Sequence, residues 1–132
     1  MKVLKVIILS IVVMTGVAAC TERPRPDALA AEAARTYYDM LVKGNYELFV
    51  DGTYRPDSIP GSYRDQLVAN ARMYIGQQEM EHKGICEVRA AGARLDSAGL
   101  VGSAFLELVY GDSLKEQIVV PMICHDGVWY MR

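Results

Sequence analysis

The chain has 132 residues and a formal net charge of −2, from 14 basic and 16 acidic side chains. This length fills one modest hydrophobic core and leaves little chain for a second domain. The slight acidity, with no concentrated basic face, argues against a nucleic-acid partner.

The first segment, residues 1–19, has the layout of an export signal. Lys2 and Lys5 form a positive start, and a mostly apolar run over residues 6–19 follows it. That run is too short for a bilayer-spanning helix, which needs about 20 apolar residues. We therefore expect residues 1–19 to be a signal peptide that is removed from the mature protein.

The end of this segment, Val17-Ala18-Ala19-Cys20, resembles the lipobox of bacterial lipoproteins. The resemblance implies that the thiol of Cys20 accepts a diacylglycerol, and several acyl chains together anchor a protein stably in a membrane. An ordinary secretory signal with cleavage after Ala19 is the alternative. Since Thr21 and not aspartate follows the cysteine, the same resemblance implies the outer membrane, with the protein facing the periplasm.

The segment after the lipobox, residues 20–27, contains prolines between charged side chains, which predicts a short tether. Asp27 can cap a first helix, and Gly44 can end it in a left-handed conformation. Four residues at helical spacing predict the buried face of this helix: Ala30, Ala34, Tyr37 and Leu41.

Two further helices are expected before residue 84. Residues 46–50 predict a short helical piece, and residues 51–61 predict a loop because they contain Asp51-Gly52, Pro56 and Pro60-Gly61. A long helix is predicted over residues 63–83. Its inner face is predicted to comprise Leu67, Ala71, Tyr74 and Met80.

The second half of the chain predicts an antiparallel sheet. The expected strands are residues 85–95, 100–110, 114–124 and 128–131. Asp126-Gly127 is a strong hairpin signal. Pro121 cannot donate to a strand ladder, so its strand should be an edge there or carry a bulge. Helices followed by a meander of strands predict an α+β domain.

Alternation along two of these strands predicts which side chains share a face. On the second strand one face consists of Ala104, Leu106, Leu108 and Tyr110. On the third strand one face consists of Ile118, Val120, Met122 and Cys124.

Three local phrases point to a known superfamily. They are Ala34-Arg35-Thr36-Tyr37-Tyr38, Leu41-Val42-Lys43-Gly44-Asn45-Tyr46 and Asp126-Gly127-Val128-Trp129-Tyr130-Met131-Arg132. The chain resembles the nuclear transport factor 2-like, or cystatin-like, superfamily, in which N-terminal helices pack on a curved antiparallel sheet to form a cone. More closely, residues 28–132 are similar to the lumazine-binding-like domain of small bacterial lipoproteins. This fold hosts enzymes, binding modules and assembly subunits, so it does not settle function.

Cys86 and Cys124 remain after Cys20 is set aside. Outside the cytoplasm such a pair can form a disulfide, and two free thiols in a small core are the alternative. The only histidines, His82 and His125, lie in no metal-ligand motif, so we expect neither a metal nor a cofactor.

Catalysis is weakly supported by the sequence. Enzymes of the resembling superfamily that isomerise or dehydrate small molecules use a carboxylate inside the cone with tyrosine donors. Glu107 is the weak candidate for that carboxylate, with Glu116 beside it. Glu107 alternates with Leu106 and Leu108, however, so a solvated position on the opposite face is the alternative.

Aromatic side chains are the largest candidate set for a ligand pocket: Tyr37, Tyr74, Tyr110 and Trp129. Ordinary core packing is the competing interpretation of these residues. We expect a membrane-anchored, non-enzymatic module that binds a small molecule or a protein. A dimeric assembly subunit and an isomerase or dehydratase are the alternatives.

Overall fold

Residues 24–132 are described by a computed structural model, so the predicted signal peptide and Cys20 lie outside the described residues. Three helices precede four strands, and each predicted element is present with bounds shifted by at most two residues. The helices are α1 (Pro26–Val42), α2 (Tyr46–Asp51) and α3 (Gly61–His82). The strands are β1 (Ile85–Leu95), β2 (Val101–Tyr110), β3 (Lys115–His125) and β4 (Val128–Met131).

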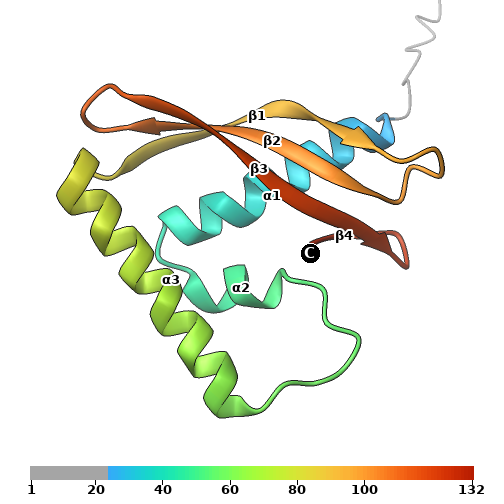
Figure 1. The fold of residues 1–132 in the computed structure, drawn as a ribbon, viewed down its shortest axis with the longest axis horizontal. Coiled ribbons are helices and arrows are strands. Elements are labelled where there is room, and N and C mark those ends of the chain that lie inside the picture. Colours follow the sequence, from blue (N-terminus) through green and yellow to red (C-terminus); the bar gives the residue numbers. More distant parts are fainter. Residues whose placement is uncertain (1–23) are drawn as a thin grey trace, which may run out of the picture.

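The four strands form one antiparallel sheet in the order β1-β2-β3-β4. Figure 1 shows the helices gathered on one side of this curled sheet, which confirms the predicted α+β class. The β3–β4 hairpin turns at Asp126 and Gly127, whose φ values are 50° and 77°. Both residues are therefore left-handed, as a two-residue hairpin of this type requires.

Helix α1 packs directly on the sheet. Ala30 and Ala34 have no exposed surface, and their small side chains let the helix approach the strands closely. The faces predicted for the second and third strands are the inner ones, since their residues are buried or packed against the core. The most deeply buried side chains of this layer are Leu41, Ala104, Leu106, Leu108 and Met122.

Pro121 lies where the ladder between β3 and β4 ends, because that ladder begins at Met122. The Pro121 carbonyl accepts a hydrogen bond from the Arg132 amide at 2.9 Å. In a strand the nitrogen and carbonyl of one residue point to the same side, so the missing N–H of Pro121 faces the end of the ladder. The predicted edge position is confirmed.

The start of α1 differs from the prediction. The helix begins at Pro26, its N-cap is Arg25 without a side-chain cap, and Asp27 lies in the first turn. Proline suits the first helical position because its N–H would be unpaired there in any case. Pro26 and Asp27, expected in the tether, therefore belong to the helix.

Helix α3 stands away from the sheet, with α2 beside it (Figure 1). Only Ala71 and Ile75 are buried along its 22 residues, and Met80, expected on the inner face, is 89% exposed. At its C-terminal end the helix is fastened to the β2–β3 turn. His82 Nδ1 lies 2.9 Å from Asp112 Oδ2, and the Asp112 amide donates to the His82 carbonyl at 3.0 Å.

Within residues 24–132 no helix combines the length and the apolar character needed to cross a membrane.

Candidate functional site

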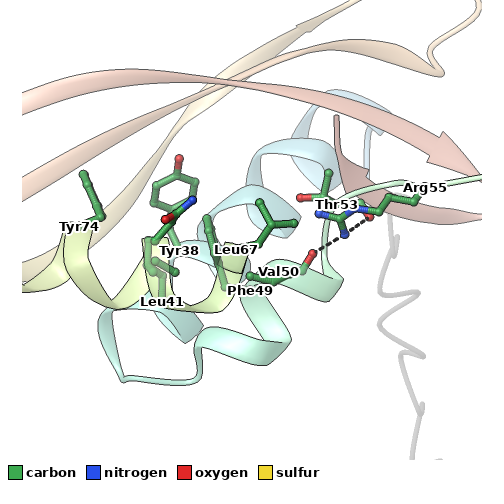
Figure 2. Close-up of a pocket in the computed structure, with 10 residues that line it drawn as sticks. Tyr38, Leu41, Phe49, Val50, Thr53, Arg55, Leu67 and Tyr74 are labelled. Atoms are coloured by element: carbon green, nitrogen blue, oxygen red, sulfur yellow. Dashed lines mark hydrogen bonds between the residues drawn. The ribbon is translucent and has the colours of Figure 1, made fainter. Parts of the chain in front are cut away.

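A cavity of about 360 Å³ lies between α1, α2 and α3. Aliphatic and aromatic side chains supply most of its wall, and they come from all three helices. These residues are Leu41, Phe49, Val50, Leu67 and Ala71. Figure 2 shows these walls, with Tyr74 at one end of the cavity and Arg55 at the other.

The cavity exists because α2 packs against α1, whereas α3 packs only loosely on both of them. The rings of Tyr38 and Phe49 meet edge to face, with 5.4 Å between their centroids. At the end of α2, a Cβ on Gly52 would lie 2.5 Å from the Tyr37 ring, so only glycine lets the chain pass there. Because α3 has few buried side chains, it closes the third wall without filling the space.

Two tyrosines, Tyr38 and Tyr74, line the cavity. Burial raises the pKa of Tyr38, and burial together with the nearby Glu116 carboxylate raises the pKa of Tyr74. Both side chains therefore stay neutral hydrogen-bond donors at physiological pH.

Arg55 is the charged side chain in the cavity wall. Its Nη1 donates to the Val50 carbonyl at 2.9 Å and, more weakly, to the Thr53 carbonyl at 3.5 Å. Arg55 and Thr53 also line an adjoining, more polar pocket of about 450 Å³. In that second pocket Arg64 is paired with Asp51, with Nη2 and Oδ2 2.8 Å apart.

The structure brings one of the four predicted pocket residues, Tyr74, to this cavity. The Tyr37 hydroxyl instead donates to the Trp129 carbonyl at 2.6 Å and fastens α1 to β4. Tyr110 is buried in the core at the end of β2. The sequence analysis missed Tyr38, which neighbours Tyr37 on α1 but points to the side that α2 covers.

Arg55 was also missed. It lies in the loop after α2, where no periodicity indicates the direction of a side chain.

Glu107 lies on the outer face of the sheet, opposite the helices. Its neighbours Leu106 and Leu108 are fully buried, whereas the Glu107 side chain is 37% exposed. It contacts Arg89 on the adjacent strand at 3.4 Å. The solvated alternative is therefore the correct one for Glu107, because strand alternation turns it away from the cone.

Glu116 and Tyr110 are brought together at the far end of the sheet. The Tyr110 hydroxyl donates to Glu116 Oε2 at 2.6 Å. Burial and this bond raise the pKa of Tyr110 well above its ordinary value. The His82 ring lies 4.4 Å from the Tyr110 ring, which links the cluster to Asp112. Glu116 itself is exposed, and no charged residue in the described part of the chain is buried.

The two remaining cysteines do not meet. Cys86 lies on β1 and Cys124 on β3, with β2 between them, and both thiols are free. Ile85 pairs with the last residue of β2, and Ile123 pairs with the first, Val101. The cysteines therefore lie at opposite ends of the sheet, roughly 30 Å apart along the strands. A disulfide needs Cα atoms within about 7 Å, so this register does not allow one within the chain.

Histidines and carboxylates are scattered. Among the described residues, no group of three or more histidine, cysteine, aspartate or glutamate side chains is arranged to hold a metal ion. His125 Nε2 lies 3.2 Å from Asp126 Oδ2, but this contact is in an exposed turn.

Comparison with known proteins shows the fold and little else. No protein-family model matches the chain, and no curated protein is similar to it in sequence. Its structure is similar to a crystal structure from Campylobacter jejuni of a protein assigned as an NTF2-like transpeptidase, with a TM-score of 0.61 and 8% identity. The match covers 76% of this chain and 94% of that chain. The chain therefore has the predicted nuclear transport factor 2-like fold, which suits binding and enzymatic roles alike.

Proposed function

We propose that this protein is a lipid-anchored, non-enzymatic binding module of the bacterial cell envelope. The observation that carries the proposal is the mostly apolar cavity between α1, α2 and α3, which has Arg55 at one end and Tyr74 at the other. Tyr38, Thr53 and Asn70 supply the other polar groups of its wall. Its volume of about 360 Å³ falls in the range of small-molecule sites, which are mostly apolar with a few placed polar groups.

Binding without catalysis is favoured by the positions of the carboxylates. An isomerase or dehydratase of this fold would need a carboxylate held in apolar surroundings next to its substrate. Glu107 lies on the outer face of the sheet, and Glu116 is exposed and engaged with Tyr110. The cavity wall itself carries no carboxylate among the residues described.

The lipid anchor is proposed from the lipobox at Cys20. Five residues, 21–25, separate this cysteine from the start of α1 at Pro26. Such a segment spans roughly 17 Å when extended, so an acylated chain would hold the domain close to the bilayer. We propose the periplasmic face of the outer membrane as the location.

An assembly role is the second candidate, and the outer face of the sheet favours it. Val119 is 58% exposed there, and Phe105, its partner on the neighbouring strand, is half-buried. Mass measurement of the full chain over a range of concentrations tests this candidate. A dimer that Val119→Lys disrupts would support it, and a monomer at every concentration would exclude it.

The binding proposal is tested by calorimetric titration of the full chain with 4-isopropylbenzamide, a small neutral molecule. We expect saturable binding to the wild type and none to Ala71→Leu, because the larger side chain fills the cavity. Ala69→Leu places the same change on α3 outside the cavity and serves as the matched control. Equal binding by all three proteins would contradict the proposal.

The anchor is tested by metabolic labelling with a palmitate analogue in the native host. Cys20→Ser should abolish labelling and release the protein from the membrane fraction. Cys86→Ser is the matched control, because Cys86 is exposed and lies in the folded domain. Labelling that persists in Cys20→Ser would count against the lipobox.

A further inference from the structure

We propose that the ligand of this cavity is a small monocarboxylic acid with an apolar body, whose carboxylate binds Arg55. This inference rests on the proposed binding function and names the chemical class of its ligand. It is argued from the unused donors of Arg55, from its position and from the charges around the cavity.

The first argument is the guanidinium of Arg55 itself. Nη1 is occupied by the carbonyls of Val50 and Thr53, which fix the plane of the group (Figure 2). Within residues 24–132, Nε and Nη2 have no hydrogen-bond acceptor. These two N–H groups form a planar fork that matches the two oxygens of a carboxylate.

The second argument is charge compensation. Arg64, the other arginine near the cavity mouth, donates from both Nε and Nη2 to Asp51, at 2.9 and 2.8 Å. No carboxylate in the described part of the chain forms an ion pair with Arg55, although Asp51 and Asp57 line the same outer pocket. The pKa of Asp51 is lowered chiefly by its hydrogen bond with Arg64 and, to a smaller extent, by the attraction of Arg55. Among the described residues, Arg55 therefore carries a positive charge that no carboxylate neutralises by direct contact.

The third argument is position. Arg55 lies in the wall of both the apolar cavity and the polar pocket next to it, so a carboxylate bound there stays near water. The free energy of removing that charge from solvent is correspondingly small. From Arg55 the apolar body would extend past Phe49 and Tyr38 toward Tyr74 (Figure 2).

The opposite end of the cavity determines how the ligand is oriented and how many charges it carries. Tyr74 presents a neutral hydroxyl there, and its pKa is raised partly by the negative charge of Glu116. A second carboxylate at this end would be repelled by Glu116, so the ligand carries one anionic group, and it points to Arg55. A volume of about 360 Å³ corresponds to roughly a dozen non-hydrogen atoms.

The test compares three probes of nearly identical shape against the full chain by calorimetry. They are 4-isopropylbenzoate, 4-isopropylbenzamide and 4-isopropylbenzamidine, which are anionic, neutral and cationic. We expect the benzoate to bind about tenfold more tightly than the benzamide, the order of a partly solvated charge-assisted pair. The benzamidine should bind more weakly than the benzamide.

Variants locate the effect at one side chain. Arg55→Gln should reduce the affinity for the benzoate to that for the benzamide. Arg55→Lys should still bind the benzoate several-fold more tightly than the benzamide. Arg72→Gln is the matched control, because Arg72 lies over the Tyr46 ring outside both pockets. Raising the salt concentration should weaken binding of the benzoate and leave the benzamide unchanged.

The possible outcomes distinguish failure of the carboxylate assignment from failure of the proposed binding function. If none of the three probes binds the wild type, both the binding function and the carboxylate assignment are overturned. If the benzamide binds and the benzoate has no advantage, only the carboxylate assignment fails. An advantage that survives Arg55→Gln also overturns it. If Arg55→Gln no longer binds the benzamide either, two other results decide whether the carboxylate assignment holds. It holds if salt weakens binding of the benzoate to the wild type and Arg55→Lys still prefers the benzoate, and it fails if neither is observed.

Discussion

The two helical layers of this protein differ in how they use their side chains. Helix α1 buries four of its 17 residues, three of them alanines, and lies flat on the sheet. Helix α3 is longer, yet it buries only two of its 22 residues. The stability of the domain therefore resides in α1 and the sheet, whereas α2 and α3 enclose the space that a ligand can occupy.

Small side chains have opposite effects in the two layers. On α1 they bring the helix and the sheet into direct contact, because strands lie opposite Ala30 and Ala34. On α3, Ala71 faces α1 and α2 across the cavity, so its small size leaves open volume. A small residue thus closes a packed interface or enlarges a cavity, according to what faces it.

The largest expected effect separates the two layers directly. Leu106→Ala should lower the free energy of unfolding by about 3 kcal/mol, because Leu106 has no exposed surface and lies in the middle of β2. Leu67→Ala on α3 should cost about 1 kcal/mol or less, since Leu67 already borders open space. Urea denaturation followed by circular dichroism measures both. Equal losses would show that α3 is as tightly packed as the sheet.

Two adjacent tyrosines of α1 allow the same comparison between the sheet and the cavity, with a smaller expected effect. Tyr37→Phe should lower the free energy of unfolding by about 1 kcal/mol, because it leaves the Trp129 carbonyl without its donor. Tyr38→Phe should change it by less than about 0.5 kcal/mol, since the Tyr38 hydroxyl has no hydrogen-bond partner within residues 24–132. The same denaturation experiment applies. A larger loss from Tyr38→Phe would reverse the assignment of these residues.

The attachment of α3 to the sheet predicts a pH dependence. The hydrogen bond to His82 holds the pKa of Asp112 below its usual value of 3.8. A lowered pKa means that this bond stabilises the folded state above about pH 4 and that the stabilisation is lost as the pH falls through the lowered value. Wild type should therefore be more stable than Asp112→Asn at neutral pH, and the difference should shrink below about pH 4. A difference independent of pH would remove the role assigned to this carboxylate.

The smallest effect is expected on the outer side of α3. Met80→Gln should change the free energy of unfolding by less than about 0.5 kcal/mol, because its side chain is 89% exposed. Hydrogen exchange of the α3 amides should also remain as in the wild type. A marked loss of stability would mean that another surface covers this face of the helix.

The sequence predicts the sheet and α1 well because alternation and helical spacing report burial there directly. Leu106 and Leu108 are buried and alternate with half-buried neighbours, and Ala30, Ala34 and Leu41 repeat at helical spacing. The Asp126-Gly127 turn is a local signal that needs no tertiary information. The fold class therefore follows from short-range patterns.

The candidate site could not be predicted in the same way. The prediction of Met80 on the inner face is wrong: it lies nine residues after Ala71, which at about 3.6 residues per turn puts the two side chains on opposite faces of α3, and Met80 is exposed. Arg55 lies in a loop, and its importance depends on which carboxylates lie near it. Tyr37 and Tyr38 are adjacent in sequence and aim at different partners, which only the position of α2 decides.

The hydrogen bond between Tyr37 and Trp129 joins positions 92 residues apart, and Thr53 forms a bridge with Met131. A growing chain therefore cannot complete this domain until residue 131 has left the ribosome. Up to that moment α1 lacks its contacts with β4, and the nascent polypeptide is only partly folded. If the proposed signal directs the chain across a membrane, this late closure would keep it competent for translocation until residue 131 emerges.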